Sequence, residues 1–430
     1  MPDRKSSSSI DRFKSAGNTE VIILAGGLGT RLREAVPELP KCMAPVAGRP
    51  FLFYVINYLR MQGLAKFIFA LGYKHEVIEQ YLADNFHTLD YQCVIEAEPL
   101  GTGGAVQLAC RHASSKNVVV TNGDTLFKAD ISTLLSLHHR LQAICTLALK
   151  PMHNMDRYGV VDVDENGIVE SLKEKQYYEQ GLINGGLYVL DREAFLAAGF
   201  PDKFSFETDF LQRNVSDKNI AGIQQEGYFI DIGIPEDFLR AQEEFKRAPL
   251  DLSAIDDRWT LFLDRDGVIN EDKPGSYIFS PEEFRFMKGG PEIFAKFARL
   301  FKYIIVITNQ RGIGKGLMTE AMLQLIHAKM SGAITGAGGR LDGIYFASSL
   351  RNNDYLRKPN PGMAVCALRD FPGIDLSRSI MVGNNISDMQ FGRNAGMYTV
   401  FLSTTNKAIR LPHPDIDLQF DSLSDFGEAL

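Results

Sequence analysis

VIILAGGLGTRL, residues 21–32, joins an apolar strand candidate directly to a glycine-rich turn that ends in Arg31. Glycine lets the backbone amides of such a turn point inward and approach a polyphosphate without a Cβ in the way. Arg31 adds a planar cationic fork to those amides. The glycine spacing differs from the dinucleotide pattern GxGxxG, and no Lys-Ser or Lys-Thr completes a Walker loop. The stretch therefore predicts a phosphate-binding turn of another kind, with a simple tight connection as the alternative.

The composition is that of an ordinary globular protein. With 430 residues and 45% hydrophobic content, the chain is long enough for two or three domains with full cores. Its net charge of −7, without a basic run, argues against nucleic acid or an anionic membrane as the main partner. Its five cysteines show no metal-ligand spacing, which favours a reducing cytoplasm. The polar residues 1–19 predict a flexible tail with neither a signal core nor a membrane span.

Alternating strands and helices predict an α/β protein with two domains. In residues 20–247 the alternation is typical of a doubly wound, Rossmann-like parallel sheet, which binds ligands at the carboxyl ends of its strands. Residues 158–172 predict a small antiparallel hairpin inserted there. Residues 248–257 are predicted to be a linker, and residues 258–430 a second Rossmann-like domain without visible similarity to the first. The expected strands are 20–25, 66–71, 91–95, 117–121, 143–149, 259–263, 303–307, 343–347, 379–382 and 397–402, and the expected helices 51–62, 74–84, 103–113, 130–140, 235–247, 290–301, 319–333, 361–370 and 386–394.

Charged residues that suit a bound phosphate follow the glycine-rich turn. Lys41 lies in a Pro-Lys loop from which a lysine could close over the same phosphates. EPLGTGGA, residues 98–105, is a second glycine-rich turn that opens a helix, and its free amides favour an acceptor-rich base or ribose. Asp124 and Asp231 each follow an apolar run, at the ligand-binding edge of the predicted sheet. Two such carboxylates suit Mg²⁺, although each one alone is as often a cap or a turn former.

Taken together, these motifs resemble the sugar-1-phosphate nucleotidyltransferase family over residues 20–245. The family pattern consists of GGxGTRL, a Pro-Lys, LGTxGA, an Asp after a strand, a Glu-Lys pair, an Asn-Gly segment and a final Asp. This chain has every part of the pattern, which makes the joint match highly specific. The last three parts are Glu174-Lys175, Asn184-Gly185-Gly186 and Asp231.

The resemblance implies roles for these residues. Asp124 and Asp231 would hold Mg²⁺, while Arg31, Lys41 and Lys175 would stabilise charge during transfer. No covalent nucleophile is required, because the sugar-phosphate oxygen attacks the α-phosphorus in line and pyrophosphate leaves. The implied nucleotide site comprises Leu24, Ala25, Gly26, Gly27, Gly29, Thr30, Glu98, Gly101 and Thr102, and the implied sugar-phosphate site comprises Asn122, Gly159, Glu174 and Asn184.

TLFLDRDGVIN, residues 260–270, places two carboxylates two residues apart at the end of an apolar strand. With the intervening side chain turned away, Asp264 and Asp266 can face one site. The remaining ligands of a twelve-residue calcium loop are absent. The motif resembles the haloacid-dehalogenase-type phosphatases over residues 258–402. That resemblance implies that Asp264 is the nucleophile and Asp266 the general acid and later base, with Thr308 and Lys358 on the transferring phosphate.

LDRDGVINED, TNQRGIGKG and RKPNPGM resemble more narrowly the heptose 1,7-bisphosphate phosphatases and their histidinol-phosphatase relatives. Asn309 and Arg357 would then contact the sugar phosphate. Two departures from the family stand out. Residues 347–354 carry no Cys or His, so no zinc is expected, and Asn384 replaces an Asp, which weakens the hold on Mg²⁺. An active phosphatase and a degenerate domain kept for assembly therefore both remain open. The implied metal ligands are Asp264, Asp266 and Asn384.

GYKHEVIEQYL, EPLGTGGA, NGDT and IDIGIPEDF look like the D-glycero-α-D-manno-heptose 1-phosphate guanylyltransferases, although mannose and glucose 1-phosphate nucleotidyltransferases share most of these motifs. The fusion favours a bifunctional cytoplasmic enzyme, whose phosphatase makes heptose 1-phosphate and whose transferase activates it with a nucleoside triphosphate, GTP being expected. One sequence does not reveal the base. The alternatives are a monofunctional transferase with an inert second domain and a regulatory subunit that senses sugar nucleotides. The oligomeric state, a homo-oligomer included, is open.

Overall fold

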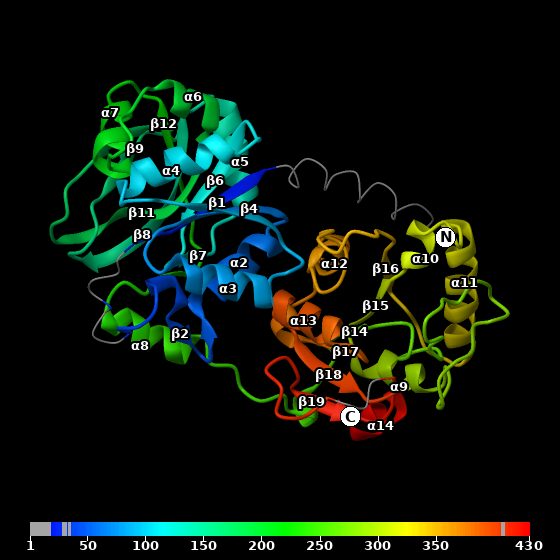
Figure 1. Cartoon of the computed structure of the whole chain (residues 1–430). Coiled ribbons are helices and arrows are strands. Elements are labelled where there is room, and N and C mark those ends of the chain that lie inside the picture. Colours follow the sequence, from blue (N-terminus) through cyan, green and yellow to red (C-terminus); the bar gives the residue numbers. More distant parts are fainter. Residues whose placement is uncertain (1–18, 28–31, 33–35, 406–408) are drawn as a thin grey trace. The chain divides into compact units, whose positions relative to one another are not determined.

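The computed structural model describes residues 19–430 except 28–31, 33–35 and 406–408. The chain divides into two compact units, Met1–Arg247 and Ala248–Leu430, each with its own sheet. In Figure 1 the first unit is coloured from blue to green and the second from green to red. Both units are α/β folds, so the predicted fold class is confirmed.

The first unit is built on a seven-stranded sheet whose strands, in spatial order, are β12 (Ile220–Gln224), β8 (Cys145–Met155), β11 (Tyr178–Asp191), β6 (Asn117–Asn122), β1 (Glu20–Ala25), β4 (Lys66–Leu71) and β5 (Asp90–Ile95). β1 pairs in parallel with β4 and β6, as do β4 with β5 and β8 with β12. β11 runs antiparallel to both β6 and β8. The sheet is therefore mixed, and the expectation of an all-parallel sheet is wrong for this strand.

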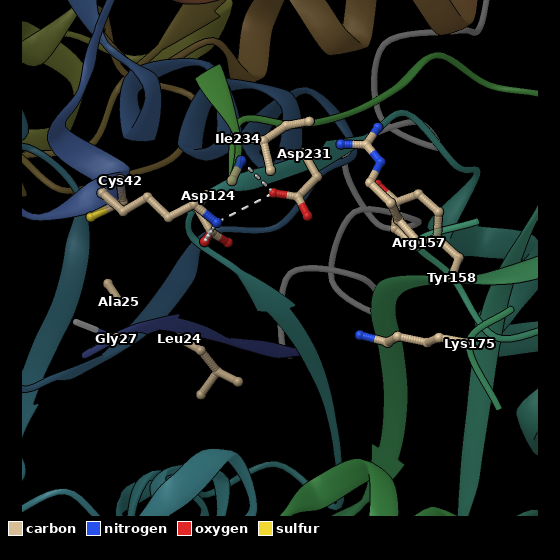
Figure 2. A pocket seen from close by; sticks show the side chains of 12 residues that line it. Leu24, Ala25, Gly27, Cys42, Asp124, Arg157, Tyr158, Lys175, Asp231 and Ile234 are labelled. Carbon is tan, nitrogen blue, oxygen red and sulfur yellow. Dashed lines mark hydrogen bonds and ion pairs between the residues drawn. The ribbon is translucent and has the colours of Figure 1, made fainter. Parts of the chain in front are cut away.

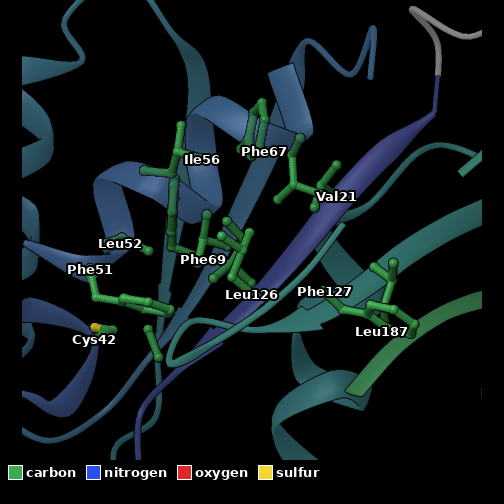
Figure 3. Packing of buried hydrophobic residues seen from close by; sticks show 14 of the residues in the cluster. Val21, Cys42, Phe51, Leu52, Ile56, Phe67, Phe69, Leu126, Phe127 and Leu187 are labelled. Carbon is green, nitrogen blue, oxygen red and sulfur yellow. The ribbon is translucent and has the colours of Figure 1, made fainter. Parts of the chain in front are cut away.

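Helices cover both faces of this sheet. Because side chains alternate along each strand, neighbouring residues of a strand are buried on opposite faces. On β1, Val21 packs in one cluster with α2 (Phe51–Met61), and Ile22 packs in another with α4 (Gly101–His112). Figure 3 shows the first cluster, in which Phe69 of β4 lies beneath α2. Burying each such side chain contributes roughly 1.5–3 kcal/mol. The packing fixes the strand that leads into the glycine-rich turn.

A short strand pair brings the last strand of the first unit to the carboxyl ends of the central strands. β7 (Thr125–Phe127) and β13 (Phe229–Asp231) pair antiparallel, with Asp231 opposite Thr125. This register places Asp231 beside Asp124, although the two residues are far apart in sequence. α8 (Pro235–Glu244) follows directly and begins with the helix-compatible Pro235.

The expected hairpin forms β9 (Val161–Val163) and β10 (Val169–Leu172), which pair antiparallel. Further segments between β11 and β13 were not anticipated from the sequence, and one of them is a single π-helical stretch, η2 (Phe206–Leu211). The remaining helices of the first unit are α3 (His75–Asn85), α5 (Ile131–Leu141), α6 (Arg192–Ala197) and α7 (Gln212–Val215), with the 3₁₀ turn η1 (Lys41–Met43).

The second unit has a six-stranded sheet whose strands, in spatial order, are β16 (Gly343–Ala347), β15 (Tyr303–Asn309), β14 (Thr260–Leu263), β17 (Ser379–Gly383), β18 (Tyr398–Leu402) and β19 (Leu418–Phe420). All of these neighbours are parallel. β14 lies where the strand order reverses, which is where open α/β sheets bind ligands. Asp264 follows β14 directly and so lies at this point.

Helices cover both faces of the second sheet. On one face, Leu261 and Leu263 pack with side chains of three helices, and on the other Met389 packs against Phe401. Leu250, within the segment predicted as a linker, is buried in the first of these clusters. The helices are α9 (Ile293–Leu300), α10 (Arg311–Gly314), α11 (Glu320–Gly336), α12 (Gly362–Asp370), α13 (Ile386–Ala395) and α14 (Leu423–Ala429).

In the described part of the chain, no helix combines the length and the apolar character that a membrane crossing requires.

Candidate active sites

The first unit has a cavity of about 360 Å³ at the carboxyl ends of its central strands. Figure 2 shows its walls, with Leu24 and Ala25 from the end of β1, and Asp124 and Asp231 from the strand ends beside it. Seven of the lining residues were predicted from the sequence, and five were not. Those anticipated are Leu24, Ala25, Gly27, Lys41, Asp124, Lys175 and Asp231, and those missed are Cys42, Arg157, Tyr158, Gly233 and Ile234.

The Lys41 ammonium lies between the two predicted metal-binding carboxylates. It forms ion pairs with Asp124 and, with Nζ and Oδ1 3.3 Å apart, with Asp231. Burial, and after it the charge of Asp124, raise the pKa of Asp231, while Lys41 opposes them. Burial alone would favour the neutral amine, but the two carboxylates raise the pKa of Lys41. The cluster therefore holds two anionic ligands around one cation.

Lys175 and Arg157 bring positive charge from another direction. Figure 2 shows the Lys175 side chain reaching into the cavity from the side opposite Cys42. The Arg157 guanidinium is bound by the carboxylate of Asp237, with Nη2 and Oδ2 2.9 Å apart. Asp237 lies in the first turn of α8 and is buried. Lys175 and Arg157 thus add two cations to the cavity that holds Asp124, Lys41 and Asp231.

A second cavity, of about 660 Å³, adjoins the first and shares Tyr158, Lys175 and Asp231 with it. All four residues predicted to bind the sugar line it, namely Asn122, Gly159, Glu174 and Asn184. The wall formed by Ser205, Glu207 and Thr208 was not predicted from the sequence. Ser205 caps η2, and Glu207 and Thr208 lie within it. No periodic pattern in the sequence predicted this element.

The glycine-rich turn is described only in part. Gly29, Thr30 and Arg31 lie outside the described residues, and Gly27 lines the first cavity. Gly26 is required by close approach, because a Cβ there would lie 2.9 Å from Oε1 of Glu96 and 3.1 Å from the backbone nitrogen of Gly72.

The predicted base-binding residues lie apart from both cavities. Glu98, Gly101 and Thr102 line neither of them, and the Thr102 hydroxyl donates to Glu207. Glu96, which the sequence reasoning passed over, lies against Gly26 and accepts a hydrogen bond from the Leu100 amide at 3.0 Å. Burial raises the pKa of Glu96, although this hydrogen bond opposes the shift.

The second unit has a smaller cavity, of about 160 Å³, beyond the end of β14. It is lined by five of the predicted residues: Asp264, Asp266, Thr308, Asn309 and Lys358. Asn309 also fixes the backbone of Lys358. Its side-chain oxygen accepts a hydrogen bond from the Lys358 amide at 3.1 Å, and its side-chain nitrogen donates to the Lys358 carbonyl at 3.3 Å. Arg357 and Asn384 are not among the lining residues, whereas Asp388 is.

Lys358 joins two carboxylates at the floor of this cavity. Its Nζ is 2.7 Å from Asp264 and 2.6 Å from Asp388, and all three side chains are almost fully buried. Burial raises the pKa of Asp264 to about 7, with Asp388 and Asp266 adding to the shift and Lys358 opposing it. The four carboxylates that line the cavity therefore outnumber its two lysines, Lys273 and Lys358.

Asp266 is held by three other side chains. Arg265 Nη2 lies 2.8 and 2.9 Å from its two oxygens, and Nδ2 of Asn270 and Nε2 of Gln310 donate to it at 3.0 and 2.8 Å. Burial favours the neutral acid, but Arg265 and these hydrogen bonds lower the pKa of Asp266. The side chain of Arg265 therefore does not line the cavity, as expected, and its guanidinium binds the Asp266 carboxylate.

The Asn384 side chain has other partners. Its amide donates to the Thr405 hydroxyl at 2.8 Å, and its carbonyl oxygen accepts from Asn385 at 3.0 Å. Asp388 accepts from the backbone amides of both asparagines and still reaches Lys358. The carboxylate available from this loop is therefore that of Asp388.

Both sites have donors that suit Mg²⁺. Within the described ranges no three His, Cys, Asp or Glu side chains form a complete metal cluster. Mg²⁺, however, typically takes one or two carboxylates and completes its shell with water and substrate phosphate oxygens. Asp124 with Asp231, and Asp264 with Asp388, meet that requirement.

Known protein families and relatives match both units. The nucleotidyl transferase family model matches residues 20–248, and the HAD-hydrolase-like model matches residues 355–426. D-glycero-alpha-D-manno-heptose 1-phosphate guanylyltransferase of Aneurinibacillus thermoaerophilus is 46% identical over 227 residues, 53% of this chain and 98% of that protein. D-glycero-alpha-D-manno-heptose-1,7-bisphosphate 7-phosphatase of Burkholderia mallei is 39% identical over 160 residues, 35% of this chain and 82% of that protein.

A solved structure also aligns with the second unit. The D,D-heptose 1,7-bisphosphate phosphatase of B. bronchiseptica, complexed with magnesium and phosphate, has 28% identity and a TM-score of 0.37, covering 40% of this chain and 96% of that one. From the family matches and the two relatives, the chain belongs to the nucleotidyl transferase family in its first unit and carries, in its second, a HAD-like hydrolase domain similar to the heptose bisphosphate phosphatases.

Proposed function

We propose that the chain is a bifunctional enzyme of nucleotide-activated heptose synthesis. Its second unit would remove the 7-phosphate of heptose 1,7-bisphosphate, and its first would transfer GMP from GTP to the resulting heptose 1-phosphate. The observation that carries the proposal is the presence, on one chain, of two units, each with a polar cavity, that are similar to proteins named for consecutive reactions. The product of one is the substrate of the other.

In the transfer step, an oxygen of the sugar 1-phosphate attacks the α-phosphorus of the triphosphate in line. The bond from that phosphorus to the bridging oxygen breaks, and pyrophosphate leaves with the electron pair. Lys175 neutralises the attacking phosphate, and Lys41 stabilises the leaving one. Asp124 and Asp231 would hold Mg²⁺, which would supply further charge neutralisation. Glu174 and Asn184 orient the sugar through its hydroxyls.

The carboxylate of Glu96 supports guanine as the base. A carboxylate only accepts hydrogen bonds, and its two oxygens match two adjacent N–H donors. Guanine presents such a pair on its Watson–Crick edge, in N1–H and the 2-amino group, whereas adenine, cytosine and thymine place an acceptor beside each donor. Glu96 lies against Gly26, at the start of the turn that would hold the triphosphate.

Glu96→Gln tests this assignment. The amide has one acceptor in place of two, so we expect kcat/KM with GTP to fall about 10- to 100-fold, while the low rate with ATP changes little. Pyrophosphate release with each of GTP, ATP, CTP and dTTP measures the effect. Glu98→Gln, two residues along and exposed, is the matched control and should behave as the parent protein. Unchanged preference in Glu96→Gln would remove Glu96 from base recognition.

In the phosphatase step, a carboxylate oxygen of Asp264 attacks the 7-phosphorus, and the bond from phosphorus to the sugar oxygen breaks. Asp266, although Arg265 lowers its pKa in the site without substrate, serves as the acid that delivers a proton to that oxygen. Water then attacks the aspartyl phosphate, Asp266 takes up its proton, and inorganic phosphate leaves. Lys358 and Thr308 hold the phosphate, and Mg²⁺ bound by Asp264 and Asp388 would neutralise its charge.

The whole proposal is tested by supplying the purified protein with heptose 1,7-bisphosphate, GTP and Mg²⁺. We expect inorganic phosphate, pyrophosphate and GDP-heptose to form together. Absence of both phosphate and GDP-heptose would refute it.

One observation favours a second candidate, a transferase whose phosphatase-like unit is inert. Asn384 offers no charge, its amide donates to Thr405 and its carbonyl oxygen accepts from Asn385, so a metal bound there would have fewer carboxylate ligands. GDP-heptose formation from supplied heptose 1-phosphate, without phosphate release from the bisphosphate, would select this candidate. Tight nucleotide binding without any pyrophosphate release would instead indicate a regulatory subunit.

A further inference from the structure

A buried histidine lies behind the second catalytic carboxylate of the phosphatase unit. His327 comes from α11, 62 residues after Arg265, and is 8% exposed. Its Nε2 lies 3.2 Å from Nη1 of Arg265, and its ring contacts Phe346. The chemistry proposed above does not use His327, and it lines none of the cavities described.

Arg265 connects this histidine to the active site. The guanidinium is fully buried, and its other edge binds Asp266 through Nη2 and, at 3.1 Å, through Nε. A guanidinium is planar, so fixing one edge fixes the direction of the other. The chain of contacts therefore runs from α11 through Arg265 to the carboxylate that must face the leaving oxygen.

We propose that His327 is a positioning residue for Asp266, acting through Arg265; the proposal rests on the phosphatase function proposed above. As the acceptor for Nη1, His327 sets the plane of the guanidinium, and the guanidinium sets the orientation of the Asp266 carboxylate. Burial, and after it the charge of Arg265, lower the pKa of His327 to about 3. The ring is therefore neutral, and its Nε2 accepts the hydrogen bond.

The remaining partners of Asp266 do not replace this control. Asn270 donates to Oδ1 and Gln310 donates to Oδ2, so each holds a single oxygen. Arg265 alone binds both oxygens. Without its acceptor, the buried Nη1 would lack a partner, and the guanidinium would have to turn or admit water to satisfy it. Asp266 would then turn with it.

Two substitutions of His327 separate positioning from packing. In His327→Gln the side-chain amide reaches as far as Nε2 and can accept from Arg265, whereas the side chain of His327→Asn is too short. We expect kcat with heptose 1,7-bisphosphate to fall about 10- to 100-fold in His327→Asn with KM little changed, and to stay within about threefold of the parent in His327→Gln.

A substrate with a better leaving group gives a readout that general destabilisation would not move. The nitrophenolate of p-nitrophenyl phosphate leaves without a proton, so formation of the aspartyl phosphate needs no acid. Hydrolysis of the aspartyl phosphate still needs Asp266 as the base. His327→Asn should therefore release a burst of about one nitrophenolate per site, followed by slow turnover, and the aspartyl phosphate should accumulate on acid quenching.

Met330→Ala is the matched control, because Met330 is fully buried one turn along α11 and has no part in this hydrogen-bond chain. It should lower the melting temperature and leave kcat unchanged. Full activity in folded His327→Asn, an equal loss in folded His327→Gln, or an equal loss in Met330→Ala would each overturn the proposal. Absence of phosphate release by the parent protein would instead overturn the phosphatase function itself. The assay of the parent protein, done before any variant is made, distinguishes the two failures.

Discussion

Asp264→Asn should abolish phosphate release from heptose 1,7-bisphosphate, lowering the rate at least about 10³-fold, while nucleotidyl transfer to supplied heptose 1-phosphate continues at the parent rate. The amide cannot attack phosphorus, and no other carboxylate occupies the position directly after β14. Inorganic phosphate and pyrophosphate, measured separately in the same samples, report the two reactions.

The substitution should leave the fold intact. Asn is nearly isosteric with Asp and can still accept from Lys358. Thermal unfolding of the variant should resemble that of the parent, and Asp257→Asn, which changes an exposed carboxylate of the same unit that does not line the cavity, should retain phosphatase activity. Undiminished phosphate release by Asp264→Asn would show that the nucleophile has been wrongly identified.

Asp124→Asn should produce the converse result, lowering nucleotidyl transfer about 10²- to 10³-fold and leaving phosphate release unchanged. The substitution removes one of two carboxylates that would hold Mg²⁺, so we also expect half-maximal activity at a higher Mg²⁺ concentration. Pyrophosphate release across a Mg²⁺ series measures both effects.

The control for this prediction is Asp217→Asn, which changes an exposed carboxylate in the same unit. It should leave the Mg²⁺ dependence as it is in the parent. Equal transfer rates for Asp124→Asn and the parent at every Mg²⁺ concentration would exclude Asp124 from the metal site.

Much of the fold was predictable because its strands and helices carry strong periodic patterns. The runs around Val21 and Leu261 are apolar on both faces, as buried parallel strands are, and both became central strands. β11 was missed because it begins with the polar segment YEQG before its apolar part, so its length and antiparallel direction were hidden. The short η2 has no repeated turn from which a period could be read.

The sites were predictable where a motif fixes a residue and its place at a strand end. Asp124, Asp231 and Asp264 are of this kind, and the structure puts each beside a cavity. Sequence spacing gave no means of choosing between Glu96 and Glu98, because only the fold shows which of them faces the glycine-rich turn. Arg265 and His327 meet across a helix and a strand end, and neither carries a local signal.

The wall common to the two cavities of the transferase unit has a thermodynamic consequence. Tyr158, Lys175 and Asp231 line both cavities, so a ligand that orders these side chains in one cavity has already paid part of the entropy of ordering them for the other. If nucleotide and sugar phosphate bind in these cavities as proposed, we expect their binding to be cooperative. Because such coupling is reciprocal, the factor by which nucleotide strengthens sugar-phosphate binding must equal the factor by which sugar phosphate strengthens nucleotide binding.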